Sequence, residues 1–248
     1  MGRPQVYRTR SLCVVAILLF SIGSNGLLFA EVSSKTINIK STPVQYRVIL
    51  PKDYDPAQAY PGVLAFGGGP QTMDVVENTI RRNWKFEAEQ RGYIVVLPAA
   101  SGGQLFFQGG ERIFPEFLDK LLVDYKIENN KFHIAGISNG GISAFHIAAL
   151  HPKYFISITA FPGFFPNITE ERVRAIADMC IYMHVGEFDQ MGWTPRIQQQ
   201  AEVFQKVGLN IHFTIEKGQK HRLETFADKN AHRLFDQFEQ ARQGCTLP

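Results

Sequence analysis

Apolar positions along the chain follow two different spacings. Eight short runs are continuously apolar or alternate apolar with polar positions, and they are rich in β-branched residues, which is typical of β-strands. These runs cover residues 36–39, 44–50, 62–66, 93–97, 131–137, 155–160, 180–185 and 211–215. Six longer stretches have helical spacing, and Gly or Pro follows several of them. They cover residues 72–90, 111–125, 139–150, 169–178, 195–207 and 223–242.

The order of these elements predicts the fold class. The first two strands follow one another without a helix, whereas a helical stretch separates each later strand from the next. Such alternation is typical of parallel strands joined by helices that cover both faces of a sheet. We therefore predict an α/β protein with an eight-stranded, mostly parallel sheet that starts with an antiparallel edge.

The N-terminal segment differs from the remainder of the chain. Residues 1–30 combine three arginines, an apolar run at 12–22 that is short for a membrane span, and small residues near their end. This pattern is typical of a secretory signal peptide, and an N-terminal membrane anchor extended through 27–29 is the alternative. We expect one domain at 31–248, because no repeat or linker divides it, in a secreted or periplasmic protein or a membrane-anchored one.

Charge and motif content limit the partners of this domain. The whole chain has 26 Lys and Arg against 23 Asp and Glu, and residues 1–30 hold three of the arginines and no acidic residue. The remaining domain is formally neutral, which argues against a nucleic-acid partner. No Cys/His spacing suggests zinc, and the glycine run at 67–69 lacks the following Lys-Ser/Thr of a phosphate loop. We therefore expect no metal and no organic cofactor.

The segment Gly-Ile-Ser-Asn-Gly at 136–140 connects a predicted strand to a predicted helix. Glycines on both sides of Ser138 permit a sharp turn that lifts the hydroxyl above the carboxyl edge of the sheet, beside the N-terminus of the helix. Fewer than about one in ten chains of this composition would contain such a motif by chance, and the strand–turn–helix context strengthens it. Ser138 is therefore a candidate nucleophile.

A serine nucleophile needs a base and a carboxylate that orients the base. Six of the seven histidines lie within or beside predicted strands and helices, whereas His221 lies in the loop between the last strand and the last helix. That loop and Ser138 share the carboxyl edge of the sheet. The loop after strand 180–185 supplies Asp189 and Glu187; we favour Asp189, and Glu187 is the alternative.

Other residues at the same edge complete a candidate acyl-transfer site. The backbone N–H of Asn139 is one expected oxyanion donor, and Gly68, or else Gly69, supplies the second. Five aromatic residues are candidates for a substrate pocket, with core packing as the alternative for each of them: Phe106, Phe107, Phe164, Phe165 and Trp193.

Two cysteines remain once residues 1–30 are removed. Cys180 opens a strand at the amino edge of the sheet, while the last predicted helix starts at the catalytic edge and runs roughly 30 Å down the sheet. Cys245 follows that helix, so we predict a disulfide between Cys180 and Cys245 in an oxidising compartment. The alternative is one buried and one exposed thiol.

These features resemble the α/β-hydrolase superfamily over about residues 36–243. The segments GISNGGISAFHIAALHPKYF, HVGEFD and GQKH are most similar to secreted esterases grouped with polyhydroxybutyrate depolymerases and with feruloyl or acetylxylan esterases. One departure is Phe66, since the family commonly carries His before the glycine loop. The short segment 161–179 indicates no large cap domain, so the site is expected to be open to bulky or polymer-linked esters.

The resemblance implies an acyl-enzyme mechanism. Ser138 would attack an ester carbonyl, His221 would transfer the proton, and Asp189 would orient His221. Another serine acyl hydrolase, such as a peptidase or thioesterase, is the first alternative, although peptidases with this triad usually add a gating domain. A non-catalytic binding protein is the second alternative.

Overall fold

The computed structural model describes residues 1–2 and 32–245. The targeting segment predicted for residues 1–30 lies outside the described residues, apart from the first two. Among the described residues, no helix has the length and hydropathy needed to cross a membrane.

Eight strands form one sheet in the order β1-β2-β4-β3-β5-β6-β7-β8. Their bounds are β1 (Val32–Ile39), β2 (Thr42–Ile49), β3 (Tyr60–Phe66), β4 (Ile94–Pro98), β5 (Ile127–Gly136), β6 (Phe155–Ala160), β7 (Cys180–Gly186) and β8 (Ile211–Glu216). Strand β2 is antiparallel to both β1 and β4, and all the other pairs are parallel. The predicted sheet with an antiparallel edge is therefore confirmed. Lys40 and Ser41, both with positive φ, make the tight turn between β1 and β2.

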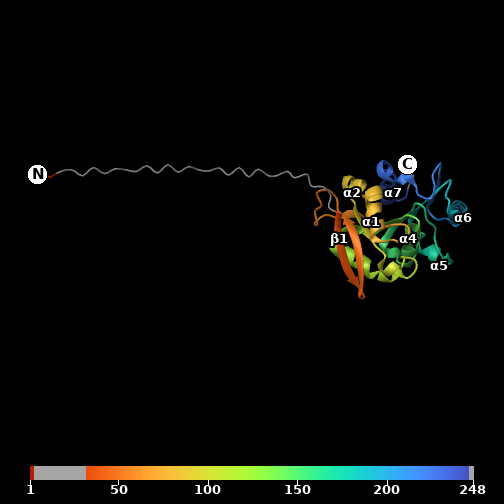
Figure 1. Cartoon of the computed structure of the whole chain (residues 1–248), viewed down its shortest axis with the longest axis horizontal. Helices are drawn as coiled ribbons and strands as arrows, with labels where there is room; N and C mark the ends of the chain where they lie inside the picture. Colours follow the sequence, from red (N-terminus) through yellow and green to blue (C-terminus); the bar gives the residue numbers. More distant parts are fainter. Residues whose placement is uncertain (3–31, 246–248) are drawn as a thin grey trace.

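The helices differ from the predicted ranges mainly where a backbone constraint interrupts them. Their bounds are α1 (Met73–Thr79), α2 (Lys85–Arg91), α3 (Glu116–Asp124), α4 (Asn139–Leu150), α5 (Glu170–Ala175), α6 (Trp193–Lys206) and α7 (His232–Arg242). Figure 1 shows β1 on the side of the domain away from helices α5 and α6. A π-helical turn, Ile80–Trp84, joins α1 to α2. The predicted helix 111–125 is divided before Pro115, because a residue that precedes proline favours extended backbone, as Phe114 does here.

The prediction of a last helix over 223–242 is wrong for the first half of this range. Two short 3₁₀ turns, Glu224–Phe226 and Asp228–Asn230, occupy this part, and α7 starts only at His232. Asp228 has a φ of +53°, a left-handed conformation that an α-helix cannot contain. The catalytic-edge loop is therefore longer than the sequence pattern indicated.

Alternate residues of the central strands pack against opposite helical layers. Val63 and Ala65 of β3 lie in a core with α1, α2 and α7, whereas Leu64 and Phe66 lie in a second core that includes residues of α3, α4 and α6. Helix α5 packs on α4, on the same side as this second core. The parallel strands are thus buried on both faces, and their carboxyl ends and the loops that follow carry the candidate site.

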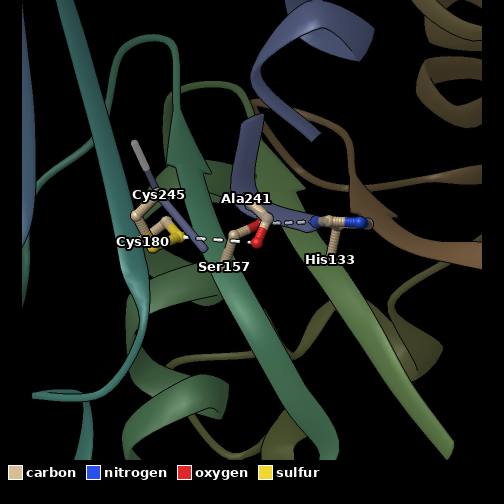
Figure 2. Close-up of a disulfide and its surroundings, with 5 residues drawn as sticks. All are labelled: His133, Ser157, Cys180, Ala241 and Cys245. Atoms are coloured by element: carbon tan, nitrogen blue, oxygen red, sulfur yellow. Dashed lines mark hydrogen bonds between the residues drawn. A yellow bond between two sulfur atoms is a disulfide. The ribbon is translucent and has the colours of Figure 1, made fainter. Parts of the chain in front are cut away.

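A disulfide joins Cys180, at the start of β7, to Cys245, just after α7, with the two Cα atoms 5.6 Å apart. The predicted bridge is therefore confirmed in the structure. Figure 2 shows the Cys180 sulfur beside the carbonyl oxygen of Ala241 in α7, 3.9 Å away. Nearby, His133 of β5 hydrogen-bonds to the Ser157 hydroxyl of β6 at 2.7 Å. The bridge ties the end of α7 to the amino edge of the sheet, opposite Ser138.

We predict that the bridge contributes substantially to stability. It joins residues 65 apart in sequence, and closing a loop of that length in the unfolded chain corresponds to about 4 kcal/mol in the chain-entropy model. Denaturant unfolding of Cys245→Ser, with and without reductant, should give equal midpoints, both below the midpoint of the oxidised wild type. Two titratable thiols in the denatured, unreduced domain would show that the bridge does not form.

Candidate active site

The backbone at Ser138 adopts the sharp turn that the glycine spacing predicted. Ser138 has φ 56° and ψ −119°, between the end of β5 and the start of α4. Such a conformation costs about 1–3 kcal/mol and persists only where the surroundings enforce it. Here the Ser138 N–H donates to the carbonyl oxygen of Pro162 at 2.7 Å, so the loop after β6 holds the turn.

Two glycines are required by close backbone approaches at this turn. A Cβ on Gly136 would collide with the backbone of Gly140, one turn further along the chain. A Cβ on Gly140 would collide with the carbonyl oxygens of Phe66 and Gly67, at the end of β3. These contacts bring the start of α4 against β3 and place Ser138 at the carboxyl edge of the sheet.

Ser138, His221 and Asp189 form a continuous hydrogen-bonded chain. His221 Nε2 lies 2.9 Å from Ser138 Oγ, and His221 Nδ1 lies 2.8 Å from Asp189 Oδ2. The Asp189 side chain is completely buried, and its other oxygen accepts the N–H of Met191 at 2.8 Å. Because a carboxylate only accepts hydrogen bonds, Nδ1 carries the proton and Nε2 is left to accept the Ser138 hydroxyl.

The structure brings Asp189, and not Glu187, to His221. Glu187 is exposed, and its carboxylate accepts the N–H of Gly218 at 2.9 Å, on the loop that leads to His221. This bond joins the two loops at their bases. Glu187 is thus placed as a brace between the loops, and the geometry favours Asp189 for the orienting role.

An ion pair beneath these loops, with a buried carboxylate and a partly exposed guanidinium, was missed by the sequence analysis. The Glu216 carboxylate, at the end of β8, accepts two hydrogen bonds at 2.9 Å from the Arg233 guanidinium of α7. Burial alone would raise the pKa of Glu216, but the hydrogen bonds of His184 and Arg233 and the positive charge of Arg233 outweigh it and lower the pKa to about 2. The Glu216 carbonyl oxygen accepts the N–H groups of Glu187 and Gln219. Glu216 therefore anchors the loops that carry Asp189 and His221.

The expected oxyanion donors lie on either side of Ser138. The N–H of Asn139 is the first of α4, so it has no acceptor within the helix. A Cβ on Gly68 would lie 3.4 Å from the Ser138 Cβ, whereas nothing lies within 4 Å of such an atom on Gly69. Of the two glycines, Gly68 is therefore the nearer to Ser138. The Asn139 side chain donates to the Gly69 carbonyl oxygen at 2.8 Å and so ties the glycine loop to α4.

Gln71 fixes the glycine loop, and no local sequence signal pointed to it. It is fully buried with a φ of +53°. Its amide nitrogen donates to the Gly67 carbonyl oxygen at 3.2 Å and to the Ser143 hydroxyl at 3.0 Å, and its amide oxygen accepts the N–H of Phe106 at 3.1 Å. One side chain thus connects the glycine loop, helix α4 and the loop after β4.

The five aromatic candidates fall into two groups. For Phe106 and Phe165, each only 1% exposed, the structure favours core packing, the alternative to a substrate pocket. The ring of Phe106 packs on Phe66 and that of Phe165 on Phe145, with centroids 5.0 and 5.4 Å apart. Phe106 lies in the loop after β4 and Phe165 in the loop after β6, and both side chains turn back from these loops into the core.

The other aromatic candidates lie closer to solvent or to the triad. The edge of Trp193 meets the His221 ring with centroids 4.9 Å apart, and Phe164 packs on Trp193 at the same distance. Phe107 is half-buried. Trp193 therefore forms one wall beside the imidazole. Within residues 1–2 and 32–245, no group of three or more His, Cys, Asp or Glu side chains is arranged to hold a metal ion.

Sequence comparison gives two curated relatives, and no protein-family model matches the chain. The dipeptidyl-peptidase 5 of Porphyromonas gingivalis is 32% identical over 136 residues, which are 48% of this chain and 19% of the relative. That of Porphyromonas endodontalis is 30% identical over 155 residues, 53% of this chain and 21% of the relative. The match thus spans about a fifth of the length of these relatives.

Solved structures match more of the chain. A ferulic acid esterase has a TM-score of 0.65 and 18% identity, over 86% of this chain and 98% of that one. A thermostable esterase has a TM-score of 0.62 and 20% identity, over 75% and 54% of the two chains. A putative dipeptidyl aminopeptidase IV from Bacteroides ovatus has a TM-score of 0.64 and 14% identity, over 87% and 36%. The strand order, the turn at Ser138 and these neighbours together show that the chain has the α/β-hydrolase fold.

Proposed function

We propose that the protein is a serine hydrolase that cleaves carboxylic esters through an acyl-enzyme intermediate. The observation that carries this proposal is the hydrogen-bonded chain from Ser138 through His221 to Asp189, with both links within 2.9 Å. A serine hydroxyl is a weak nucleophile without such a base. The strained turn at Ser138 presents the hydroxyl beside an unpaired helical N–H, as acyl transfer requires.

Each step follows from the positions of these groups. Ser138 Oγ attacks the ester carbonyl carbon while its proton moves to His221 Nε2, and the Asp189 carboxylate stabilises the imidazolium. The N–H groups of Asn139 and Gly68 stabilise the carbonyl oxygen as it becomes negative. The C–O bond then breaks, and His221 returns the proton to the leaving alcohol. Water attacks the acyl-enzyme with His221 again as base, which releases the acid and regenerates Ser138.

The surface beside the triad supports an ester with an apolar group. Phe188 and Met191, on either side of Asp189, are 62% and 61% exposed. They belong to the same loop as Asp189, and the edge of Trp193 meets the His221 ring. Exposed apolar side chains that gather at a site usually mark a binding surface. An aryl or alkyl acyl group would bury these side chains on binding, and the ferulic acid esterase that resembles nearly the whole domain supports an aryl group.

Peptide hydrolysis is the second candidate, because both curated relatives are dipeptidyl-peptidases. The same three residues could cleave an amide, since His221 would then protonate a leaving amine. The two functions differ in the leaving group that the site accepts. Initial rates with p-nitrophenyl esters of increasing chain length, feruloyl esters and dipeptidyl p-nitroanilides distinguish them directly.

The wild-type domain should hydrolyse the esters faster than the anilides, and Ser138→Ala should lose several orders of magnitude in kcat, because triad residues act as a unit. A fluorophosphonate probe should label the wild type but not Ser138→Ala. Equal labelling of both proteins would remove Ser138 as the nucleophile. Faster cleavage of the anilides would instead support the peptidase.

We expect Asp189→Asn to lower kcat by about 10³–10⁴-fold, because an amide at this position favours the wrong tautomer of His221. Glu187→Gln is the matched control, since its amide oxygen can still accept the Gly218 N–H, and its kcat should stay near that of the wild type. Thermal unfolding of both variants checks that they are folded. A large loss in Glu187→Gln alone would assign the orienting role to Glu187.

Gln71→Met should lower kcat by about 10²-fold, because the glycine loop would lose the side chain that fixes it and the second oxyanion donor would shift. Gln200→Met is the control. Gln200 is also buried and makes two hydrogen bonds, but these go to the backbone of Phe165 and not to the glycine loop. Both variants should be less stable than the wild type, but only Gln71→Met should have a lower kcat. Equal kcat values for the two variants, measured where both are folded, would contradict this role.

A further inference from the structure

A polar groove of about 480 Å³ lies between the edge strand β8 and helix α7. Tyr182 and His184 of β7 contribute to it, as do His212 and Thr214 of β8, residues of α7 and Gln205 near the end of α6. None of these residues belongs to the triad or to the glycine loop. The groove is thus a separate feature from the candidate active site.

The charged side chains of the groove are already paired within the protein. Arg233 binds both oxygens of the Glu216 carboxylate, and Asp236 accepts a hydrogen bond from Arg91 at 2.7 Å. The groove therefore offers neither a spare cation for an anionic ligand nor a spare carboxylate for a cationic one.

Its titratable aromatic side chains are neutral near pH 7. Burial raises the pKa of Tyr182 to about 12, so the phenol keeps its proton. Burial also lowers the pKa values of His184 and His212. For His184, the charge of Arg233 adds to this effect, while hydrogen bonds to Glu216 and Gln237 only partly oppose it. Apart from the paired Arg233 and Asp236, the polar groups that line the groove are consequently uncharged donors and acceptors.

Four buried polar atoms of the residues that line the groove have no hydrogen-bond partner among the described residues. Two are ring nitrogens, Nδ1 of His184, which lies 3.3 Å from the Glu216 carboxylate, and Nε2 of His212. The other two are the hydroxyl of Tyr182, a residue that is 1% exposed, and the amide oxygen of Gln237. The Gln237 amide nitrogen is already bonded to His184 Nε2 at 2.9 Å, which leaves the oxygen uncommitted. An unpaired buried polar group costs about 1–3 kcal/mol, so several in one groove point to a ligand that completes them.

We propose that this groove binds a neutral glycan, with one or two sugar units seated between β8 and α7. Each sugar hydroxyl can both donate and accept a hydrogen bond, which matches a surface of amides and hydroxyls. Tyr182 and Gln237 supply the buried partners, and Gln205, Gln240 and Thr214 supply further neutral groups. The volume lies within the range of small-ligand pockets. Binding here does not depend on the proposed hydrolase activity.

Binding is tested in Ser138→Ala, so that turnover cannot interfere, by isothermal titration with xylohexaose, cellohexaose and mannohexaose. At least one should bind with a dissociation constant in the millimolar range. In the same background, Tyr182→Phe should weaken binding by about threefold to tenfold, the equivalent of one hydrogen bond. Its unfolding temperature should be unchanged or higher, because the substitution removes an unpaired buried hydroxyl while it keeps the ring.

A pair of glutamines on α6 provides the matched control. Gln205 lines the groove, whereas Gln198 lies on the same helix outside it and bonds to Glu202. Gln205→Ala should weaken binding, and Gln198→Ala should leave it unchanged. The proposal is overturned if none of the three glycans binds, if binding is the same in Tyr182→Phe and Gln205→Ala as in their parent, or if a hexamer of galacturonic acid binds more tightly than every neutral glycan.

Discussion

The candidate site depends on the close backbone contact between the turn at Ser138 and the end of β3. Because no side chain separates Gly140 from the carbonyl oxygens of Phe66 and Gly67, helix α4 starts directly against the sheet. That contact forces Ser138 into a strained conformation, which the Pro162 carbonyl oxygen holds. It also places the N–H of Asn139, the first of α4, next to Ser138 without an acceptor in the helix. The positions of Ser138 and of Asn139, the proposed nucleophile and oxyanion donor, thus have a single geometric cause.

Two buried polar side chains hold the other parts of the site in place. Gln71 fixes the glycine loop from below, and the Glu216–Arg233 pair fixes the loops that carry Asp189 and His221. The Gln71 amide and the Glu216 carboxylate are both hydrogen-bonded, so both can lie in the interior without the cost of an unmatched polar group. Catalytic geometry must be held to within about half an ångström, and such supporting contacts provide that precision.

Helix α7 connects the two edges of the sheet. At its start Arg233 reaches Glu216 beneath the triad loops, in its middle Gln237 bonds to His184, and near its end Ala241 contacts Cys180 of the disulfide. The bridge at the amino edge therefore restrains the same helix that supports the carboxyl edge. Loss of the bridge would free the end of α7 first, whereas loss of Arg233 would act directly on the loops of the site.

The sequence by itself determined the eight strands, the bounds of α4, the turn at Ser138 and the meeting of Cys180 with Cys245. These features follow from short-range periodicity, glycine spacing and the direction in which elements run. The spacing of apolar residues alone predicted a helix over residues 223–231, where the left-handed Asp228 prevents one. It also could not show that Phe106 and Phe165 turn from their loops back into the core. Only the tertiary structure decided that Asp189 contacts His221 while Glu187 braces a loop, and that Gln71 and Glu216 organise the site. Their partners lie far away in the chain, Gln71 and Ser143 being 72 residues apart, and such contacts exist only once the sheet has assembled.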